Sequence, residues 1–560
     1  MADYDAIVVG AGFSGIRALW ELGQLGLTAK GFEAGSDVGG AWYWNRYPGA
    51  RTDSEAWVYT MNFAPGSREA WNYSERYPAQ AEVQQYLGRV ADRFELRRLI
   101  QFDTRVVSAH YSDERNVWTV TTSDGVATTC RFFLPATGPL SVAKEPPFAG
   151  LADYKGVWLQ TSTWPTGKVD LRGKRVAIVG TGATGVQIVP KIAPVVQQLT
   201  VFQRTPNYVL PGRNYTIDEH EAAAILDNYD ATWKCANNHA NGLAMHSTGK
   251  TVRQTADATA IRQVLDAGWE RGGFHFQMET FDDIATDQKA NEVAAAYIRQ
   301  KIHAIVQDQH TADLLSPHYP FMSKRPPCGH FYYEAFNRPN VELVDIRHDG
   351  LALYEDGIRT TKTQVDRPFD VVIFALGFDA GTGALAEIDV RGSHGRRLRD
   401  IWDAKVETFA GVLVPGFPNM FVVCGPHIPF GNMPVVLDLE TSWIGRTLRH
   451  MQDNRLTRID ASPASAQAWS AHLDDAFHST IFAESAKSTG AWFVGSNVPG
   501  KSTAPLFYFG GVPSWQTWLD NEAKAGWTSM DFSPAVPADN TLEGSETVRD
   551  AVAGKVSIAA

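Results

Sequence analysis

The first residues able to do chemistry form a glycine turn near the start of the chain. Gly10, Gly12 and Gly15 give a GxGxxG pattern between the apolar run 5–9 and a helix-like stretch. Such glycines let the backbone approach a pyrophosphate, and the helix that follows offers free N–H groups. Glu33 stands 23 positions after Gly10, at the end of a second apolar segment. A carboxylate there accepts hydrogen bonds from a ribose 2′-OH, so the pattern predicts a site for FAD.

A second turn of the same kind follows the apolar run 175–179. Gly180, Gly182 and Gly185 repeat the spacing, and Arg204 stands 24 positions after Gly180, where the first turn has its acid. An arginine pairs bidentately with a phosphate, which predicts a 2′-phosphate and therefore NADPH. The plain alternative is a surface arginine beside a turn. Two dinucleotide sites in one chain indicate that electrons pass between two cofactors.

A flavin reduced by NADPH can pass its electrons to a disulfide, to another carrier or to oxygen. The four cysteines are widely spaced and form no CxxC pair. A disulfide reductase needs such a redox pair, so the sequence argues against that outcome. Composition does not exclude transfer to another carrier.

Residues 39–53, GGAWYWNRYPGARTD, carry the most specific pattern in the chain. They resemble, at every fixed position, the (A/G)GxWxxxx(F/Y)P(G/M)xxxD signature of the Baeyer–Villiger monooxygenases. The family's FxGxxxHxxxW signature is similar to residues 154–164, with Tyr154 in place of phenylalanine and Gln160 in place of histidine. Glutamine keeps hydrogen bonding but does not titrate near neutral pH. Weaker resemblances occur at 324–338, 374–379 and 492–501.

The resemblance implies a flavin monooxygenase that uses NADPH and O2 to turn a ketone into an ester or lactone through a C4a-peroxyflavin. Such chemistry needs a fixed cation near the flavin to stabilise negative oxygen, and arginine keeps its proton. By resemblance that cation is Arg325 and its orienting partner is Asp53. The alternatives are a surface charge for Arg325 and a turn-capping carboxylate for Asp53.

The remaining cofactor contacts are carried over residue by residue. The expected FAD-binding residues are Gly10, Gly12, Gly15, Glu33, Gly40, Trp42, Asp53, Tyr59 and Val106. The expected NADPH-binding residues are Gly180, Thr181, Gly182, Thr184, Gly185, Gln187, Arg204, Thr205, Lys324 and Trp492. Trp492 belongs to a loop that closes over the nicotinamide cofactor in the family, although packing is an open alternative for so large a ring.

Two rival functions stay open. A related flavin monooxygenase oxidises nitrogen or sulfur atoms, and the 39–53 signature together with Arg325 favours the ketone instead. The second rival is a relative that no longer oxygenates and acts as an NADPH oxidase or a binding protein. The replacement of the family's histidine by Gln160 leaves this alternative open. Because Arg325 and Asp53 are both present, we expect oxygenation.

These residues must be positioned by an α/β fold with two Rossmann-like dinucleotide-binding domains and a helical insertion. Segments between the motifs give the domain boundaries, since helical composition sets in after the second glycine turn. The predicted order is FAD-binding domain, first part, 1–140; linker 141–165; NADPH-binding domain, first part, 166–212; helical insertion 213–314; NADPH-binding domain, second part, 315–377; FAD-binding domain, second part, 378–531; tail 532–560.

The composition of the chain limits the kinds of molecule that it is expected to bind. A net charge of −11 over 560 residues argues against nucleic acid. No apolar run approaches the length of a membrane span and no signal peptide is visible, so a cytoplasmic enzyme is expected. The histidines show no HExxH spacing, and no metal site is predicted. Aromatic residues make up 11% of the chain, with 17 tryptophans. The long helical insertion and the aromatic-rich C-terminal half point to a bulky apolar substrate. No oligomeric state follows from the sequence.

Overall fold

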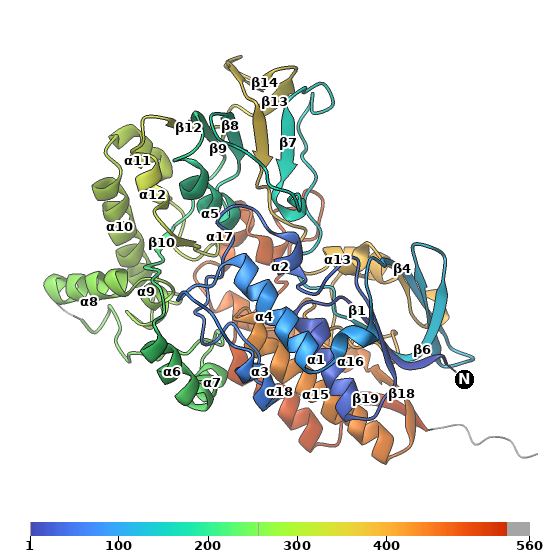
Figure 1. Ribbon diagram of the computed structural model, residues 1–560. Helices are drawn as coiled ribbons and strands as arrows, with labels where there is room; N and C mark the ends of the chain where they lie inside the picture. The colour runs from blue at the N-terminus through green and yellow to red at the C-terminus, as the bar shows by residue number, and fades with distance from the viewer. Residues whose placement is uncertain (1, 256, 535–560) are drawn as a thin grey trace, which may run out of the picture.

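The computed structural model describes residues 2–255 and 257–534, which fold around a mixed seven-stranded sheet and a parallel five-stranded sheet (Figure 1). The first sheet, on the right of the figure, has the order β17-β4-β5-β6-β1-β2-β3. Its members are β1 (Tyr4–Val9), β2 (Ala29–Phe32), β3 (Ile100–Gln101), β4 (Val106–Ser112), β5 (Val117–Thr122), β6 (Ala127–Pro135) and β17 (Asp389–Arg391). Strands β6, β1, β2 and β3 run parallel, whereas β5 pairs antiparallel with both β4 and β6.

The second sheet, at the top of Figure 1, has the order β12-β9-β8-β16-β7 and is parallel throughout. Its strands are β7 (Val157–Gln160), β8 (Arg175–Val179), β9 (Gln198–Gln203), β12 (Val341–Asp345) and β16 (Val371–Phe374). The central strands β8 and β16 are almost entirely buried, as apolar runs in a parallel sheet covered on both faces must be.

Each sheet contains one strand that is followed along the chain by a glycine turn and a helix. Helix α1 (Phe13–Gln24) follows β1, and helix α5 (Ala183–Ile192) follows β8. The residues of α1 that face the protein, such as Ile16 and Leu19, are fully buried. The prediction of two Rossmann-like units is confirmed.

A helical segment separates the two parts of the second sheet and lies on the left of Figure 1. In the described residues of 213–314 every regular element is an α-helix: α6 (Glu219–Asp227), α7 (Tyr229–Asn238), α8 (Ala258–Arg271), α9 (His275–Met278), α10 (Gln288–Ile305) and α11 (Gln309–Leu315). Aspartates cap several of them; Asp287, for example, accepts from the backbone N–H groups of Lys289 and Ala290 at the start of α10.

Shorter elements and the C-terminal helices complete the structure. The helices are α2 (Ala41–Trp44), α3 (Pro65–Glu69), α4 (Gln80–Arg93), α12 (Tyr332–Ala335), α13 (Gly383–Ala386), α14 (Leu398–Ala404), α15 (Met433–Asp453), α16 (Pro463–His478), α17 (Ala483–Ser488) and α18 (Val512–Lys524). The 3-10 helices are η1 (Leu96–Leu99), η2 (Thr161–Thr163), η3 (Ser393–Gly395) and η4 (Trp492–Val494). The remaining strands are β10 (Leu210–Pro211) with β11 (Cys328–Gly329), β13 (Leu351–Tyr354) with β14 (Gly357–Thr360) and β15 (Asp366–Pro368), and β18 (Leu456–Ala461) with β19 (Met530–Pro534).

Strands lie at two of the predicted domain limits. The segment 141–165, expected as a linker, contributes the edge strand β7 to the second sheet, where Val157–Gln160 pairs with β16. Backbone pairing to an already formed sheet edge, which no side-chain pattern announces, explains the difference. The tail expected from residue 532 begins inside β19, which ends at Pro534. Residues 535–560 lie outside the described part of the chain.

Much of the tryptophan content belongs to the core. Trp118, Trp233, Trp443, Trp469 and Trp515 are among the largest fully buried side chains. Large rings contribute a great deal of buried apolar area, so these five stabilise the fold rather than face a ligand.

Candidate active site

The first glycine turn is shaped by close backbone contacts. Gly10 has a φ of 109°, and a Cβ added to it would lie 2.5 Å from the carbonyl oxygen of Ala136. A Cβ on Gly15 would lie 1.8 Å from the carbonyl oxygen of Gly10. Helix α1 starts after Gly12, which supplies no side-chain cap. The N–H groups at this helix start are therefore available to an anion such as a pyrophosphate.

Glu33 is 5% exposed and braces this turn. Its Oε2 accepts from the backbone N–H of Ala11 and its Oε1 from that of Gly35, both at 2.7 Å. Burial raises the pKa of Glu33, and the two backbone hydrogen bonds oppose that shift. Each carboxylate oxygen has a further lone pair, so the acid predicted for the ribose can brace the turn and accept from a hydroxyl as well.

The second glycine turn has the same construction and opens into a cavity. Gly180 has a φ of 115°, and a Cβ there would lie 2.4 Å from the carbonyl oxygen of Ala375. At Gly182, the residue before α5, no atom lies within 4 Å of such a Cβ. Gly182 has no side chain to cap α5. The start of α5 thus has both free N–H groups and open space for a phosphate.

A cavity of about 1350 Å³ extends between the two sheets and the helical insertion. Most predicted site residues line it: Trp42, Asp53, Tyr59, Gly180, Thr181, Gly182, Thr184, Gln187, Arg204, Thr205, Lys324, Arg325 and Trp492. The others do not: Gly10, Gly12, Gly15, Glu33 and Gly40 gather around the first glycine turn, Gly185 lies inside α5, and Val106 starts β4 with its side chain in the core. Their cofactor contacts stay predictions.

Residues 39–53 join the two units. Gly49 has a φ of 89°, and a Cβ there would lie 2.4 Å from the carbonyl oxygen of Gln187 in α5. The hydroxyl of Tyr47 donates to Gln187 Oε1 at 2.9 Å, and Gln187 Nε2 donates to the carbonyl of Arg51 at 3.1 Å. The signature segment therefore packs directly on the first helix of the second unit, and the absence of a side chain at Gly49 leaves room for this contact.

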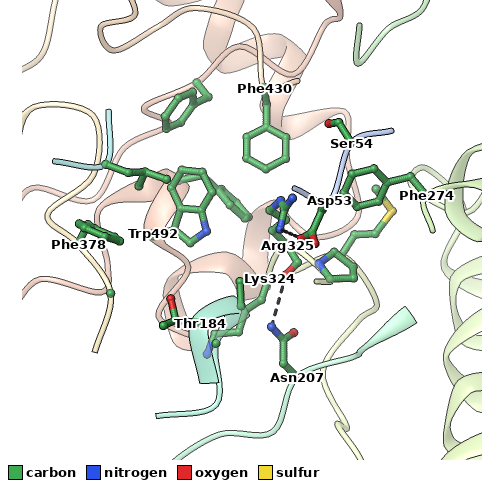
Figure 2. Close-up of a pocket in the computed structure, with 18 of the residues that line it drawn as sticks. Asp53, Ser54, Thr184, Asn207, Phe274, Lys324, Arg325, Phe378, Phe430 and Trp492 are labelled. Atoms are coloured by element: carbon green, nitrogen blue, oxygen red, sulfur yellow. Dashed lines mark hydrogen bonds and ion pairs between the residues drawn. The ribbon is translucent and has the colours of Figure 1, made fainter. Parts of the chain in front are cut away.

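Arg325 and Asp53 meet in this cavity, although they come from distant segments. Nη1 of Arg325 lies 2.6 Å from Oδ2 of Asp53 (Figure 2). The ring of Phe274 lies 5.3 Å from Cζ of Arg325, close enough for a cation–π contact. Burial opposes the charge of Arg325, but Asp53 outweighs it, and the pKa of Arg325 is raised. The cation is thus held ionised beside the cavity.

Aromatic rings surround this ion pair. Trp492 lies 5.6 Å from Phe430 and 5.3 Å from Phe507, measured between ring centroids. Figure 2 shows Trp492 beside Phe430 on one side of Arg325, with Phe274 on the other. Trp42 donates from Nε1 to the hydroxyl of Tyr59 at 3.1 Å. Aromatic side chains therefore form much of the cavity wall near Arg325.

Another part of the cavity is lined by three cations, which are Arg204, Lys324 and Lys144. Arg204 is exposed, Lys324 is half-buried, and neither forms an ion pair in the described residues. Burial lowers the pKa of Lys324 to about 8, and repulsion by Arg204 and Lys144 adds to the effect. A group of unneutralised cations in a cavity is suited to a phosphate.

Sequence reasoning missed Lys144, Phe274 and Asn207. Asn207 Nδ2 donates to the backbone carbonyl of Arg325 at 3.4 Å and so supports the segment that carries it. Gln160, which departs from the family pattern, donates from Nε2 to the carbonyl of Lys144 at 2.9 Å. No local motif marks these residues, because each acquires its place through contacts far along the chain.

The residues present fit both dinucleotides. Both glycine turns have closely packed backbones and uncapped helix starts, and the second adds a group of cations. Asp53 Oδ1 is buried without a hydrogen-bond partner in the described residues. A buried acceptor of this kind costs free energy unless a donor from a bound group satisfies it. Among the described residues no group of three metal-ligating side chains occurs, and no helix is long and apolar enough to cross a membrane.

Fold and site together define a flavoprotein oxygenase with a second site for a nicotinamide cofactor. The Flavin-binding monooxygenase-like family matches residues 5–218. A Baeyer-Villiger monooxygenase of Pseudooceanicola batsensis is 38% identical over 94% of this chain and 96% of its own. A phenazine N-monooxygenase of Lysobacter antibioticus is 35% identical over 94% and 96%. The crystal structure of cyclohexanone monooxygenase from Rhodococcus sp. Phi1 bound to NADP+ superposes with a TM-score of 0.91 and 36% identity, covering 95% of this chain and 99% of that one.

The chain belongs to the Baeyer–Villiger monooxygenases. It is a flavin-dependent enzyme that uses FAD and NADPH, and the expectations for both cofactors are confirmed. Its relatives include a cyclohexanone 1,2-monooxygenase of Acinetobacter sp. and an acetone monooxygenase of Gordonia sp..

Proposed function

We propose that this enzyme converts a bulky, mainly apolar ketone into an ester or lactone, with Arg325 as the catalytic cation. The observation that carries the proposal is the ion pair of Arg325 with Asp53, 2.6 Å long and facing the 1350 Å³ cavity. Both residues are within an aromatic surrounding in which charge is poorly screened. An arginine fixed there stabilises negative oxygen more strongly than the same group in water.

Bound FAD and NADPH supply the electrons with which O2 is activated. The task of Arg325 is to direct the N–H donors that Asp53 does not occupy toward oxygen atoms that gain negative charge as the ketone carbonyl is attacked. Its guanidinium does not act as an acid, because it keeps its proton at every working pH. Asp53 orients the guanidinium through Nη1 and compensates the cost of burying it.

The predicted cofactor contacts form the second part of the proposal. The turn at Gly10, Gly12 and Gly15 would hold the FAD pyrophosphate, and the turn at Gly180, Gly182 and Gly185 that of NADPH. The cations Arg204 and Lys324 would hold the 2′-phosphate. Uncapped starts of α1 and α5 support these assignments. The predicted domain limits belong to the same proposal.

The size and lining of the cavity support a bulky substrate. Its aromatic residues include Phe274, Phe430, Phe482, Phe493, Phe507 and Phe509. Rings of this kind exclude water and contact apolar surface, which would leave the carbonyl as the polar group directed at Arg325. A cytoplasmic location is also proposed, and the four free cysteines fit a reducing compartment.

Oxidation of a nitrogen atom is the second candidate, because one relative is a phenazine N-monooxygenase. The test is NADPH-dependent turnover of two matched panels, bulky cyclic ketones and aromatic amines or N-heterocycles, with products identified by mass spectrometry. We expect esters or lactones from the ketones. N-oxides without any ester would favour the second candidate, and hydrogen peroxide without an organic product from either panel would overturn the proposal.

A further inference from the structure

Lys144 stands where the segment between the two glycine turns meets the cavity. It is half-buried and lines the cavity together with Arg204 and Lys324. Burial lowers the pKa of Lys144, and repulsion from Arg204 contributes to the shift. In residues 2–255 and 257–534 none of the three cations lies within salt-bridge distance of a carboxylate. Three like charges near one another favour a multiply charged anion between them.

The backbone of Lys144 is fixed while its ammonium group keeps free donors. Its N–H donates to the carbonyl of Gly377 at 3.1 Å, and its carbonyl accepts from Gln160 Nε2 at 2.9 Å. The Nζ atom donates to the backbone carbonyl of Asn497 at 2.6 Å. An ammonium has three donors, so two remain for oxygen atoms in the cavity.

Asn497 belongs to the segment 490–501, which also contains Trp492. Asn497 Nδ2 donates to the carbonyl of Phe378 at 2.8 Å, and Lys501 pairs with Asp379. At the other end, Nη2 of Arg204 lies 3.4 Å from the place that a Cβ on Gly490 would occupy. Lys144 therefore binds the segment that carries Trp492, and Arg204 lies next to the start of that segment.

We propose that Lys144 is a third ligand of the NADPH 2′-phosphate and that it couples this phosphate to the placement of segment 490–501. A phosphate monoester carries a charge of about −1.5 to −2 at pH 7, which three cations can neutralise. While one donor of Lys144 holds Asn497, the other two bind phosphate oxygens. Binding of the phosphate thereby stabilises the position of the segment that places Trp492 in the cavity. This inference rests on the proposed phosphate site of Arg204 and Lys324.

The test measures binding of 2′,5′-ADP and of 5′-ADP, which lacks the 2′-phosphate, to the FAD-loaded enzyme by calorimetry. Lys144→Met keeps the length of the side chain and removes its charge. We expect it to weaken 2′,5′-ADP binding roughly tenfold or more and to leave 5′-ADP binding within about twofold. Lys144→Arg should restore most of the loss. Lys168→Met, at an exposed lysine that does not line the cavity, is the matched control.

Equal weakening of both nucleotides by Lys144→Met, or no weakening, would overturn the phosphate role. Coupling is tested by deuterium uptake in peptides that cover 490–501. With 2′,5′-ADP at saturation, uptake should slow in the wild type and slow less in Lys144→Met; equal slowing overturns the coupling. If Arg204→Ala affects both nucleotides equally, the proposed phosphate site itself fails. If Arg204→Ala is selective and Lys144→Met is not, only the present inference fails.

Discussion

Arg325 and Asp53 are 272 positions apart in the sequence and form an ion pair of 2.6 Å at the wall of the cavity. Asp53 closes the signature segment 39–53, and Arg325 follows the helical insertion. The pair thus connects the end of the signature segment with the segment that leads from the helical insertion to β12 of the second sheet. Because Asp53 holds the guanidinium of Arg325 in place, a movement that separated the two residues would also displace the cation from its position at the cavity.

We expect Arg325→Ala to reduce ester formation by about 10²- to 10³-fold, the usual effect of removing a group that stabilises negative oxygen. Reduction of bound FAD by NADPH, followed by absorbance without oxygen, should stay close to the wild-type rate. Arg262→Ala, at an exposed arginine of the helical insertion, is the control. A parallel fall of reduction and ester formation would mean that Arg325 only supports cofactor binding.

We expect Arg204→Ala to raise the KM for NADPH by roughly tenfold, since a charge-assisted contact to the phosphate is lost. The KM for NADH should change by less than about twofold. Both constants come from steady-state consumption of the reduced cofactor. Arg172→Ala, at an exposed arginine paired with Asp170, controls for the general loss of positive charge. Equal changes for the two cofactors would refute the phosphate assignment.

The lowered pKa of Lys324, about 8, predicts that cofactor affinity depends on pH. Below this value the lysine is charged and attracts the 2′-phosphate; above it the free enzyme loses that charge. The KM for NADPH should therefore rise as the pH increases beyond about 8, where the phosphate is already fully ionised. The KM for NADH should stay level. Lys324→Met should flatten the NADPH profile, and an unchanged profile would contradict the assignment.

Gly49→Ala should destabilise the FAD-loaded enzyme, because a Cβ would lie 2.4 Å from the carbonyl oxygen of Gln187. Gly125→Ala is a matched control: its φ of 83° resembles the 89° of Gly49, yet no atom lies within 4 Å of its Cβ. Both substitutions lose stability because alanine is unfavourable in the left-handed backbone region. Only Gly49→Ala also forces a shift of α5, which should lower the free energy of unfolding by a further amount of about 1–3 kcal/mol. Melting temperatures measure the difference. Equal losses would show that the contact with α5 is unimportant.

The sequence predicted the elements whose signals are local. Strand, glycine turn and helix follow one another within about twenty residues, so the motifs at Gly10 and Gly180 announced both Rossmann-type units. The helical composition of 213–314 likewise marked the insertion. Edge strand β7 escaped prediction, since its pairing with β16 depends on a partner some two hundred residues later in the chain. Lys144 and Phe274 escaped for the same reason.

The sequence by itself determined the two cofactor turns and, through the signature ending at Asp53, the class of chemistry. The turns depend on short-range backbone geometry, which a few glycines and one acidic or basic residue specify. The class of chemistry follows from the resemblance of residues 39–53 to a known family signature. Only the tertiary structure decided which side chains share the cavity. The contact of Gly49 with Gln187, the pairing of Arg325 with Asp53 and the gathering of Arg204, Lys324 and Lys144 all arise from packing between segments that are distant in the sequence. Such contacts join residues that no local pattern relates.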